Sequence, residues 1–221
     1  MDKIICIGKN FSEHAREVGL ATDDVPVLFI KPPSILREWT TKCCVLDLSL
    51  PPNATSIEHE CEVVVRIGHD GFLLSPDEAG SLIASFTLGL DMTRRDLQMT
   101  SKSKGEPWTV SKVFIDSAVV GPWVEGAELS TYLRKPFHFF VDGRLRQTGA
   151  VEQMILSPAQ CVGLASQYFP LKAGDLIFTG SPAGSGKIMA GNEGRLEWGV
   201  ITYTVKWRPY GVRANNSSST S

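Results

Sequence analysis

Cysteine is scarce in this sequence, and no two cysteines have the spacing of a metal-binding or redox pair. The 221 residues contain five cysteines, an odd number, and no two of them form a C-x-x-C pair. Neither a disulfide framework nor a cysteine-rich zinc site fits this pattern, and a reducing compartment is expected. The cysteine content therefore argues against a secreted domain that disulfides hold together.

Long apolar runs and basic runs are also missing. No stretch approaches the roughly 18 apolar residues that a membrane span needs, and the opening MDKIICIGKN has no apolar core of a signal peptide. The 22 Lys and Arg are balanced by 24 Asp and Glu, without the basic patch of a nucleic-acid-binding protein. We therefore expect a cytoplasmic protein that acts on a small molecule, with no nucleic-acid or membrane partner; a mitochondrial or peroxisomal address is left open.

Short β-rich segments dominate what the sequence does contain. Period-two alternation and apolar runs predict strands at 3–8, 27–31, 57–67, 85–90, near 119, and at 137–141, 144–148, 176–179, 193–198 and 201–207. Caps and polar spacing predict helices at 10–19, 76–83 and 157–167, and a helix with a loop at 93–104. Segment 34–56 is expected to be irregular. The prediction is a mainly β fold with peripheral helices, one domain over 1–208 and a disordered tail at 209–221.

Two glutamates on one predicted strand are the first candidates for chemistry. Glu60 and Glu62 are two residues apart, so they share a strand face, opposite the apolar row that includes Cys61 and Val63. Adjacent carboxylates repel each other, and a hard cation such as Mg²⁺ or Ca²⁺ relieves that repulsion through oxygen ligands. The alternative is a strand whose acidic face points into water, which the strand pattern alone favours.

Asp91 ends the apolar strand 85–90, where a carboxylate is well placed to reach a site. In the polar segment that follows, Arg95 offers a bidentate fork and Gln98 an amide, three residues apart on one side of a helical turn. These groups suit carboxylate and carbonyl oxygens. A capped and solvated helix is the equally simple alternative.

Three further sites carry groups of catalytic type. His14 and Glu17 lie one helical turn apart, a spacing at which a carboxylate orients an imidazole that activates water, although surface helices often show the same spacing. Lys112 can stabilise a developing anion, or it is a surface charge. Thr179 ends an apolar strand before the loop GSPAG, where a hydroxyl and backbone N–H groups can hold a carboxylate. The loop's GSGK ending is not a P-loop, because its spacing differs and Ile188 replaces the required Ser or Thr.

The ordered set of blocks resembles the fumarylacetoacetate hydrolase family, in particular its short members, the acylpyruvate hydrolases and oxaloacetate decarboxylases. The resemblance rests on IGKNF with His14 and Glu17, FIKP, HECEV, LDMTRRDLQ, GEPWTVSK, VDG with RQ, and GDLIFTG. The blocks span about residues 4–207. Glu106 and Ser181 depart from the family pattern, and the segment 34–44 matches it least. These departures bear on substrate preference.

The resemblance implies a mixed β-sandwich roll of the fumarylacetoacetase C-terminal domain type, a homodimer, and roles for individual residues. By resemblance, Glu60, Glu62 and Asp91 bind Mg²⁺, with Mn²⁺ or Ca²⁺ as substitutes. The implied catalytic residues are His14, Glu17 and Lys112, and the implied substrate-binding residues are Arg95, Gln98 and Thr179. The implied reaction is hydrolysis of a C–C bond in a 3-acylpyruvate, with oxaloacetate decarboxylation as a second activity. An isomerase or hydratase of 2-oxo-dienoate acids and an inactive metal-binding relative are the alternatives.

Overall fold

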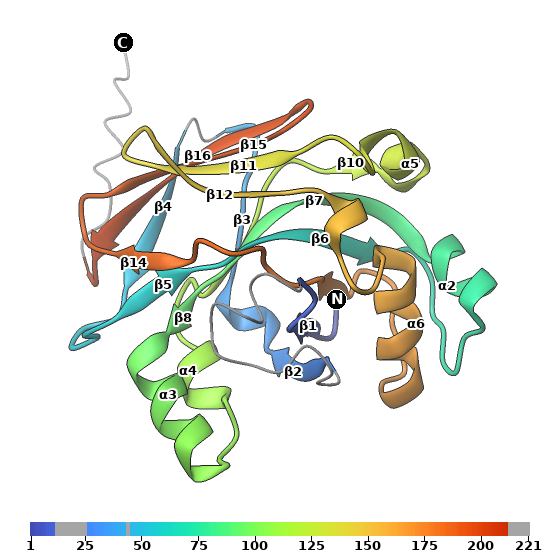
Figure 1. The fold of residues 1–221 in the computed structure, drawn as a ribbon, viewed down its shortest axis with the longest axis horizontal. Helices are drawn as coiled ribbons and strands as arrows, with labels where there is room; N and C mark the ends of the chain where they lie inside the picture. The colour runs from blue at the N-terminus through green and yellow to red at the C-terminus, as the bar shows by residue number, and fades with distance from the viewer. Residues whose placement is uncertain (12–25, 43–44, 212–221) are drawn as a thin grey trace.

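The computed structural model describes residues 1–11, 26–42 and 45–211, and its strands form three sheets (Figure 1). The largest sheet runs in the order β2 (Val27–Lys31), β1 (Ile4–Gly8), β13 (Leu176–Phe178), β6 (Cys61–Ile67), β7 (Ile83–Asp91), β9 (Ala118–Val120) and β3 (Leu36–Glu38), with β10 (Val124–Glu125) also paired to β7. The second sheet runs β12 (Arg144–Gly149), β11 (Phe137–Val141), β15 (Glu193–Trp198), β16 (Ile201–Pro209) and β4 (Val45–Leu50). The third consists of β14 (Gly186–Ile188), β5 (Ile57–His59) and β8 (Thr93–Arg94).

The helices are short and lie at the periphery of the sheets. They are α2 (Pro76–Ser81), α3 (Arg95–Lys104), α4 (Thr109–Lys112), α5 (Leu129–Tyr132) and α6 (Pro158–Tyr168), with 3-10 turns η1 (Pro33–Ile35), η2 (Gly126–Glu128) and η3 (Val151–Gln153). Ser75 and Ser157 cap α2 and α6 with reciprocal capping boxes, and proline follows each cap. Figure 1 shows α2 beside α6 on one side of the molecule, and α3 with α4 on another, next to β8.

The main core lies between the two larger sheets. Alternate residues of β6, Cys61, Val63, Val65 and Ile67, face it and are at most 1% exposed. Aromatic side chains of the second sheet meet them, and Phe86 packs edge-on against Trp198 at a centroid distance of 5.3 Å. The opposite face of the large sheet is buried too, in a second cluster that includes Val64. Burial on both faces explains the continuous apolar run of residues 63–65 in β6.

Most predicted strands are present in the structure, and the mainly β prediction is confirmed. The Asp142-Gly143 turn joins β11 to β12 as an antiparallel hairpin, as the dipeptide predicted. The prediction that 34–56 is irregular is wrong, since η1, β3 and β4 lie there. Both strands are short or partly exposed, and each pairs in parallel with a distant strand, β3 with β9 and β4 with β16. Such pairing leaves no local turn signal in the sequence.

The predicted strand 57–67 is two strands in two sheets. β5 pairs with β14 and β8, whereas β6 pairs with β7 and β13. Glu60 lies at the break between them, and its carbonyl accepts a hydrogen bond from the Asp91 N–H at 2.9 Å. The chain therefore passes from the small sheet to the large one at a residue predicted to carry chemistry.

Two predictions fall mostly on residues that the structure does not describe: residues 12–19 of the helix expected at 10–19, and residues 212–221 of the tail expected at 209–221. Of the described residues, Phe11 forms an isolated β-bridge with Met154 and Pro209 ends β16, so neither fits its prediction. No helix in the described part of the chain is long and apolar enough to cross a membrane.

Candidate active site

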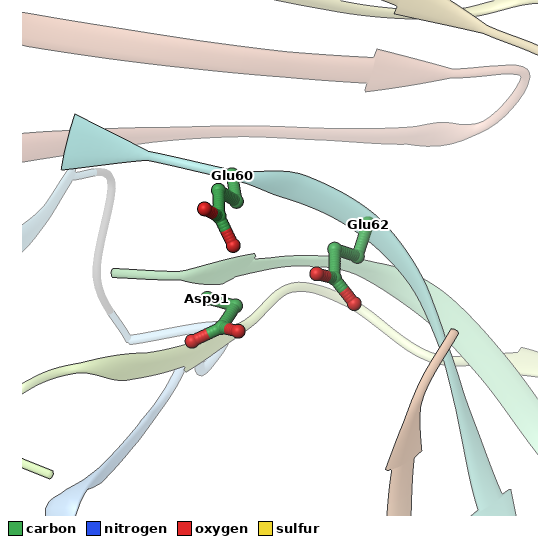
Figure 2. Close-up of side chains that lie close together, drawn as sticks. All are labelled: Glu60, Glu62 and Asp91. Atoms are coloured by element: carbon green, nitrogen blue, oxygen red, sulfur yellow. The ribbon is translucent and has the colours of Figure 1, made fainter. Parts of the chain in front are cut away.

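Three carboxylates converge where β5 passes into β6 and β7 ends. Oxygens of Glu60, Glu62 and Asp91 all lie within 4.8 Å of one another. Figure 2 shows the three side chains directed toward a common space, the two glutamates from one segment and the aspartate from its neighbour. Each residue is at most 6% exposed. The alternative of a solvated acidic strand face is therefore wrong.

Backbone pairing fixes these positions. Glu62 stands opposite Gly89 in the β6–β7 ladder, and Cys61 stands opposite Leu90. Because the ladder ends in the bond from the Asp91 N–H to the Glu60 carbonyl, the three carboxylates are held by main-chain hydrogen bonds on neighbouring strands. Gly89 has no room for a side chain, since a Cβ would come within 2.5 Å of the Val119 carbonyl oxygen.

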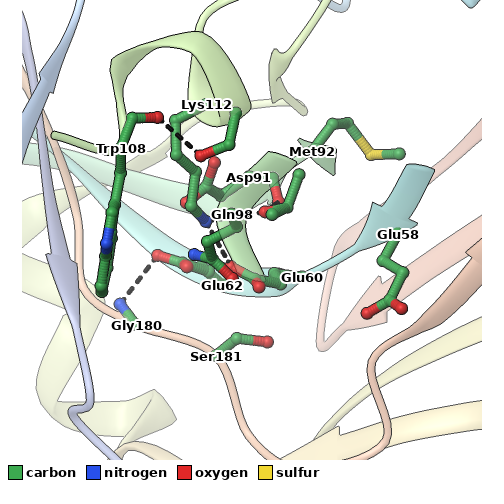
Figure 3. Close-up of polar contacts among 12 residues, drawn as sticks. Glu58, Glu60, Glu62, Asp91, Met92, Gln98, Trp108, Lys112, Gly180 and Ser181 are labelled. Carbon is green, nitrogen blue, oxygen red and sulfur yellow. Dashed lines mark hydrogen bonds and ion pairs between the residues drawn. The ribbon is translucent and has the colours of Figure 1, made fainter. Parts of the chain in front are cut away.

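Two buried lysines neutralise part of the acidic charge. The Lys112 Nζ lies 2.7 Å from Glu60 Oε2, from Asp91 Oδ2 and from the Thr93 hydroxyl (Figure 3). Burial opposes its charge, yet Asp91 and Glu60 outweigh burial and raise the pKa of Lys112 above its usual value. Lys31, fully buried, pairs with Asp91 Oδ1 at 2.5 Å and donates to the Ser117 carbonyl at 2.6 Å.

Arg95 joins the triad to the third sheet. Its Nε lies 2.7 Å from Glu58 Oε2, and its Nη2 lies 2.7 Å from Glu60 Oε1. Its Nη1 donates to Gln98 Oε1 at 2.5 Å, so the two predicted substrate-binding residues touch each other across the first turn of α3. One guanidinium thus holds Glu58, Glu60 and Gln98 in fixed positions beside the triad.

Glu62 is the carboxylate that lacks a cation. Among the described residues no Lys, Arg or His lies within 4 Å of it, and its Oε2 accepts the Gly180 N–H at 2.7 Å. Burial first, and then the charges of Asp91 and Glu60, raise the pKa of Glu62 well above its usual value. A further positive charge between these three groups would remove that penalty.

The donor set fits a hard divalent cation. Two oxygens that ligate one Mg²⁺ or Ca²⁺ at about 2.0–2.6 Å lie no more than about 4–5 Å apart. The triad oxygens satisfy this limit, and all three donors are carboxylates, the ligands such ions prefer. Glu60, Glu62 and Asp91 are therefore the residues that would hold the ion.

The loop after β13 closes the site from the opposite side. Thr179 is fully buried, and its hydroxyl donates to the Val63 carbonyl at 2.8 Å. Gly180 follows with a φ of +97°, which turns its N–H toward Glu62. The Asn10 side chain donates to the Thr179 carbonyl at 2.7 Å and ties the loop to the segment after β1.

A buried amide connects this loop to the segment that carries Glu60 and Glu62. Gln147 Oε1 accepts the Cys61 N–H at 3.0 Å and lies 2.8 Å from His59 Nδ1, while its Nε2 donates to the Ser181 hydroxyl at 2.7 Å. Because an amide oxygen only accepts, the proton of a neutral His59 is on Nδ1. Burial lowers the pKa of His59 to about 4, against the opposing effect of the Gln147 bond.

The structure brings together seven of the nine predicted site residues: Glu60, Glu62, Asp91, Arg95, Gln98, Lys112 and Thr179. His14 and Glu17 lie outside the described residues, so their roles stay predictions. Sequence reasoning gave no role to Lys31, Glu58, His59 or Gln147, which all contact the site. One signal was available for Lys31: it ends an apolar strand before proline, much as Asp91 ends another.

Comparison with known proteins agrees with this geometry. Residues 3–205 match the family described as Fumarylacetoacetate (FAA) hydrolase C-terminal. The oxaloacetate tautomerase of Escherichia coli K12 is 32% identical over 194 residues, which cover 87% of this chain and 86% of that protein. The mitochondrial oxaloacetate decarboxylase of Dictyostelium discoideum is 32% identical over 190 residues, or 86% and 85% of the two chains. The crystal structure of fumarylpyruvate hydrolase from Pseudomonas aeruginosa with Mn²⁺ and pyruvate superposes with a TM-score of 0.88 at 32% identity, covering 95% of this chain and 90% of that one.

Proposed function

The chain belongs to the fumarylacetoacetate hydrolase family, and from this premise we propose that it is a Mg²⁺-dependent enzyme that cleaves a C–C bond in 3-acylpyruvate-type 2-oxo acids. The observation that carries the proposal is the buried triad of Glu60, Glu62 and Asp91, with Lys112 between two of its members. When bound there, the cation supplies Lewis acidity and a template for a 2-oxo acid, and Mn²⁺ or Ca²⁺ are its substitutes.

The charges around the triad suit an anionic substrate. Arg95 offers a guanidinium to the substrate carboxylate, with Gln98 beside it, and Thr179 immediately precedes Gly180, whose N–H contacts Glu62 of the triad. Arg95 and Gln98 are already fixed by hydrogen bonds, so little conformational freedom is lost when substrate binds. We assign these three residues to substrate binding on this basis.

The reaction generates a negative charge that Lys112 is placed to stabilise. Water adds to the distal carbonyl carbon of the acylpyruvate, the bond between that carbon and C3 breaks, and its electron pair leaves as the enolate of pyruvate. A proton at C3 then gives pyruvate, and the acyl group leaves as a carboxylic acid. Lys112 stays protonated, because Asp91 and Glu60 hold its pKa high, so it acts as a fixed positive charge rather than as a base. His14, oriented by Glu17, is our proposed base for the attacking water.

Oxaloacetate is the second candidate substrate. Two relatives are named as a tautomerase and a decarboxylase of that acid. Tautomerisation passes through the enolate of oxaloacetate and decarboxylation through the enolate of pyruvate, and neither reaction needs an attacking water. The site described around Lys112 therefore suits them even without the His14 and Glu17 pair.

The experiment is a Mg²⁺-dependence assay on acetylpyruvate, fumarylpyruvate and oxaloacetate. We expect metal-dependent turnover that EDTA removes and that Glu60→Ala lowers by at least about 100-fold, since it deletes a ligand. Glu125→Ala, at an exposed glutamate away from the triad, is the control. Turnover that is independent of metal, or equal in Glu60→Ala, contradicts the proposal.

His14→Ala separates the candidate reactions. If hydrolysis is the main activity, this variant loses turnover of the acylpyruvates and keeps conversion of oxaloacetate. Unchanged acylpyruvate turnover would show that the base is wrongly assigned. The isomerase or hydratase of 2-oxo-dienoate acids would be favoured instead if the wild-type protein turned over such dienoates and none of the acylpyruvates.

A further inference from the structure

A cavity of about 820 Å³ lies against β2 and the end of α3, and the reaction proposed above leaves it without a role. Its walls come from the residue after β1, from most of β2, from the last turn of α3 and from the loop that leads into α4. The lining residues are Lys9, Val27, Leu28, Phe29, Ile30, Lys102, Gly105, Glu106, Pro107, Trp108 and Thr109. Small-molecule sites in proteins fall in this range of volume.

The cavity adjoins the catalytic residues through two aromatic rings. The Phe29 ring lines it, and the ring centroid lies 5.0 Å from Lys112 Nζ, which itself contacts Glu60 and Asp91. The Trp108 ring lies 6.0 Å from that of Phe29, centroid to centroid. Figure 3 shows Trp108 extended beside Lys112, on the side of the site that includes Gly180. A substrate bound at the triad therefore has an aromatic-walled space next to it.

Lys102 places an unpaired positive charge on this cavity. It is half-buried, with Nζ 5.1 Å from the centroid of the Trp108 ring. Within the described ranges no carboxylate lies within ion-pair distance of it. Burial, and then repulsion from Arg95, lower the pKa of Lys102. A partly desolvated ammonium that lacks an acidic partner is well suited to bind an anion.

Two other charged residues line the same cavity. Lys9 adds a second cation, whereas Glu106 is exposed and adds the one carboxylate among the lining residues. An anionic ligand would be drawn toward Lys102 and repelled by Glu106. Removing the positive charge of Lys102 should therefore weaken the binding of an anion, whereas removing the negative charge of Glu106 should strengthen it.

We propose that this cavity binds the second carboxylate of 2-oxo dicarboxylic acids, with Lys102 as the residue that contacts it. The 2-oxo acid end binds at the triad, and the rest of the carbon chain passes Phe29 and Trp108. The assignment rests on the proposed function, and it narrows the substrate class to diacids long enough to span the two charges.

A purely structural role for Lys102 is the alternative. The residue lies in the last turn of α3, where a positive charge stabilises the helix through its dipole. Lys104 is in the same turn and is exposed. Lys104→Gln is therefore a matched control, because it removes one charge from the helix end without touching the cavity.

The test compares ligands that differ only in the distal carboxylate. Isothermal titration in Mg²⁺ measures 2-oxoglutarate against 2-oxopentanoate, and 2-oxoadipate against 2-oxohexanoate. We expect the wild-type protein to bind at least one diacid about tenfold more tightly than its matched monoacid, the effect of one charged hydrogen bond. Lys102→Gln should abolish this preference, Lys102→Arg should retain it, and Glu106→Gln should increase it about twofold to threefold.

Three results would overturn the assignment: no diacid preference in the wild-type protein, equal loss of affinity for both members of a pair in Lys102→Gln, or the same loss in Lys104→Gln. Failure of the proposed function would look different. In that case selective diacid binding persists, but none of acetylpyruvate, fumarylpyruvate and oxaloacetate is turned over in a Mg²⁺-dependent way. If the function holds, fumarylpyruvate should show a KM about tenfold higher in Lys102→Gln, with a smaller change for acetylpyruvate.

Discussion

Glu62 shows at the scale of one residue how a buried charge destabilises the fold that contains it. Its carboxylate is 3% exposed, and in the described chain it accepts one backbone hydrogen bond without a cation beside it. Replacing it by glutamine keeps an oxygen for the Gly180 N–H and removes the repulsion from Glu60 and Asp91. We predict that Glu62→Gln makes the metal-free protein more stable by about 1–2 kcal/mol, because a buried unpaired charge is costly.

The same variant should lose the stabilisation that Mg²⁺ gives. Urea unfolding in EDTA and in Mg²⁺ measures both effects, and Glu125→Gln, at an exposed position, is the control. A variant that is less stable without metal, or that keeps its response to Mg²⁺, contradicts this account of Glu62.

His59 gives the fold a dependence on pH. Burial disfavours the imidazolium, so the pKa of His59 is about 4 in the folded protein, below its ordinary value of 6.5. Below pH 6.5 the unfolded chain therefore takes up a proton that the folded chain refuses. The stability contributed by neutral His59 is complete above pH 6.5 and is lost as the pH falls toward 4, by up to about 3 kcal/mol.

His59→Asn tests this prediction, since its amide can still donate toward Gln147 but does not titrate in this range. Between pH 6.5 and 4.5 the free energy of unfolding should fall more steeply in the wild type than in the variant. The difference in slope should correspond to the uptake of close to one proton on unfolding. Parallel profiles would mean that His59 titrates normally in the folded protein.

At the scale of elements, the loop after β13 is a rigid part of the site. A Cβ on Gly180 would lie 2.7 Å from Asn10 Cβ, and its φ of +97° disfavours any side chain. Gly180→Ala should therefore destabilise the protein by about 2 kcal/mol and weaken Mg²⁺ binding, because the N–H that holds Glu62 must move.

Gly191→Ala is the matched control for this loop. Gly191 has a similar φ of +96°, but a Cβ there meets nothing within 4 Å. The Gly191→Ala substitution should lower stability only because alanine disfavours this φ, and it should leave Mg²⁺ affinity intact. Equal effects of the two substitutions on Mg²⁺ affinity would show that the close approach at Gly180 does not matter.

The strand that carries the glutamates shows where elements are hidden from the sequence. Period-two alternation predicted one strand over 57–67, and the alternation continues through the break at Glu60. The break arises because β5 and β6 pair with different strands, which the local pattern does not encode. Segment 34–56 was misread for a related reason, since β3 and β4 gain their stability from parallel partners far along the chain.

At the scale of the whole molecule, a cation bound at the triad would link the site to global stability. An ion that binds only the folded protein adds about 2.7 kcal/mol at 100 times its Kd. In a chain of 221 residues this should raise Tm by about 5–10 °C. Thermal unfolding with increasing Mg²⁺ measures the shift, and Glu60→Ala should abolish it. A Tm that does not respond to Mg²⁺, Mn²⁺ or Ca²⁺ would contradict the metal site.

Assembly is the second property of the whole molecule that we predict. The family resemblance implies a homodimer, so light scattering should give twice the chain mass of 24.2 kDa. A single-chain mass over the concentrations used for assays would contradict this prediction.

The sequence by itself determined the residue types of the site, the mainly β class and the order of the blocks that mark the family. These properties are local: a period of two, a turn dipeptide, or a carboxylate at the end of an apolar strand can be read from neighbouring residues. Read alone, however, Glu60 and Glu62 fitted a solvated face better than a metal site.

Only the tertiary structure decided that these carboxylates are buried and that Lys31, Lys112 and Arg95 meet them. It also decided that Glu62 has no cation within ion-pair distance in the part of the chain that the structure describes. The physical reason is that burial and charge pairing depend on contacts between distant segments. Asp91 and Lys31 are 60 residues apart in the chain, and Gly180 and Glu62 are 118 apart. The cavity at Lys102 is decided in the same way, because β2 and the end of α3 come together only in the folded molecule.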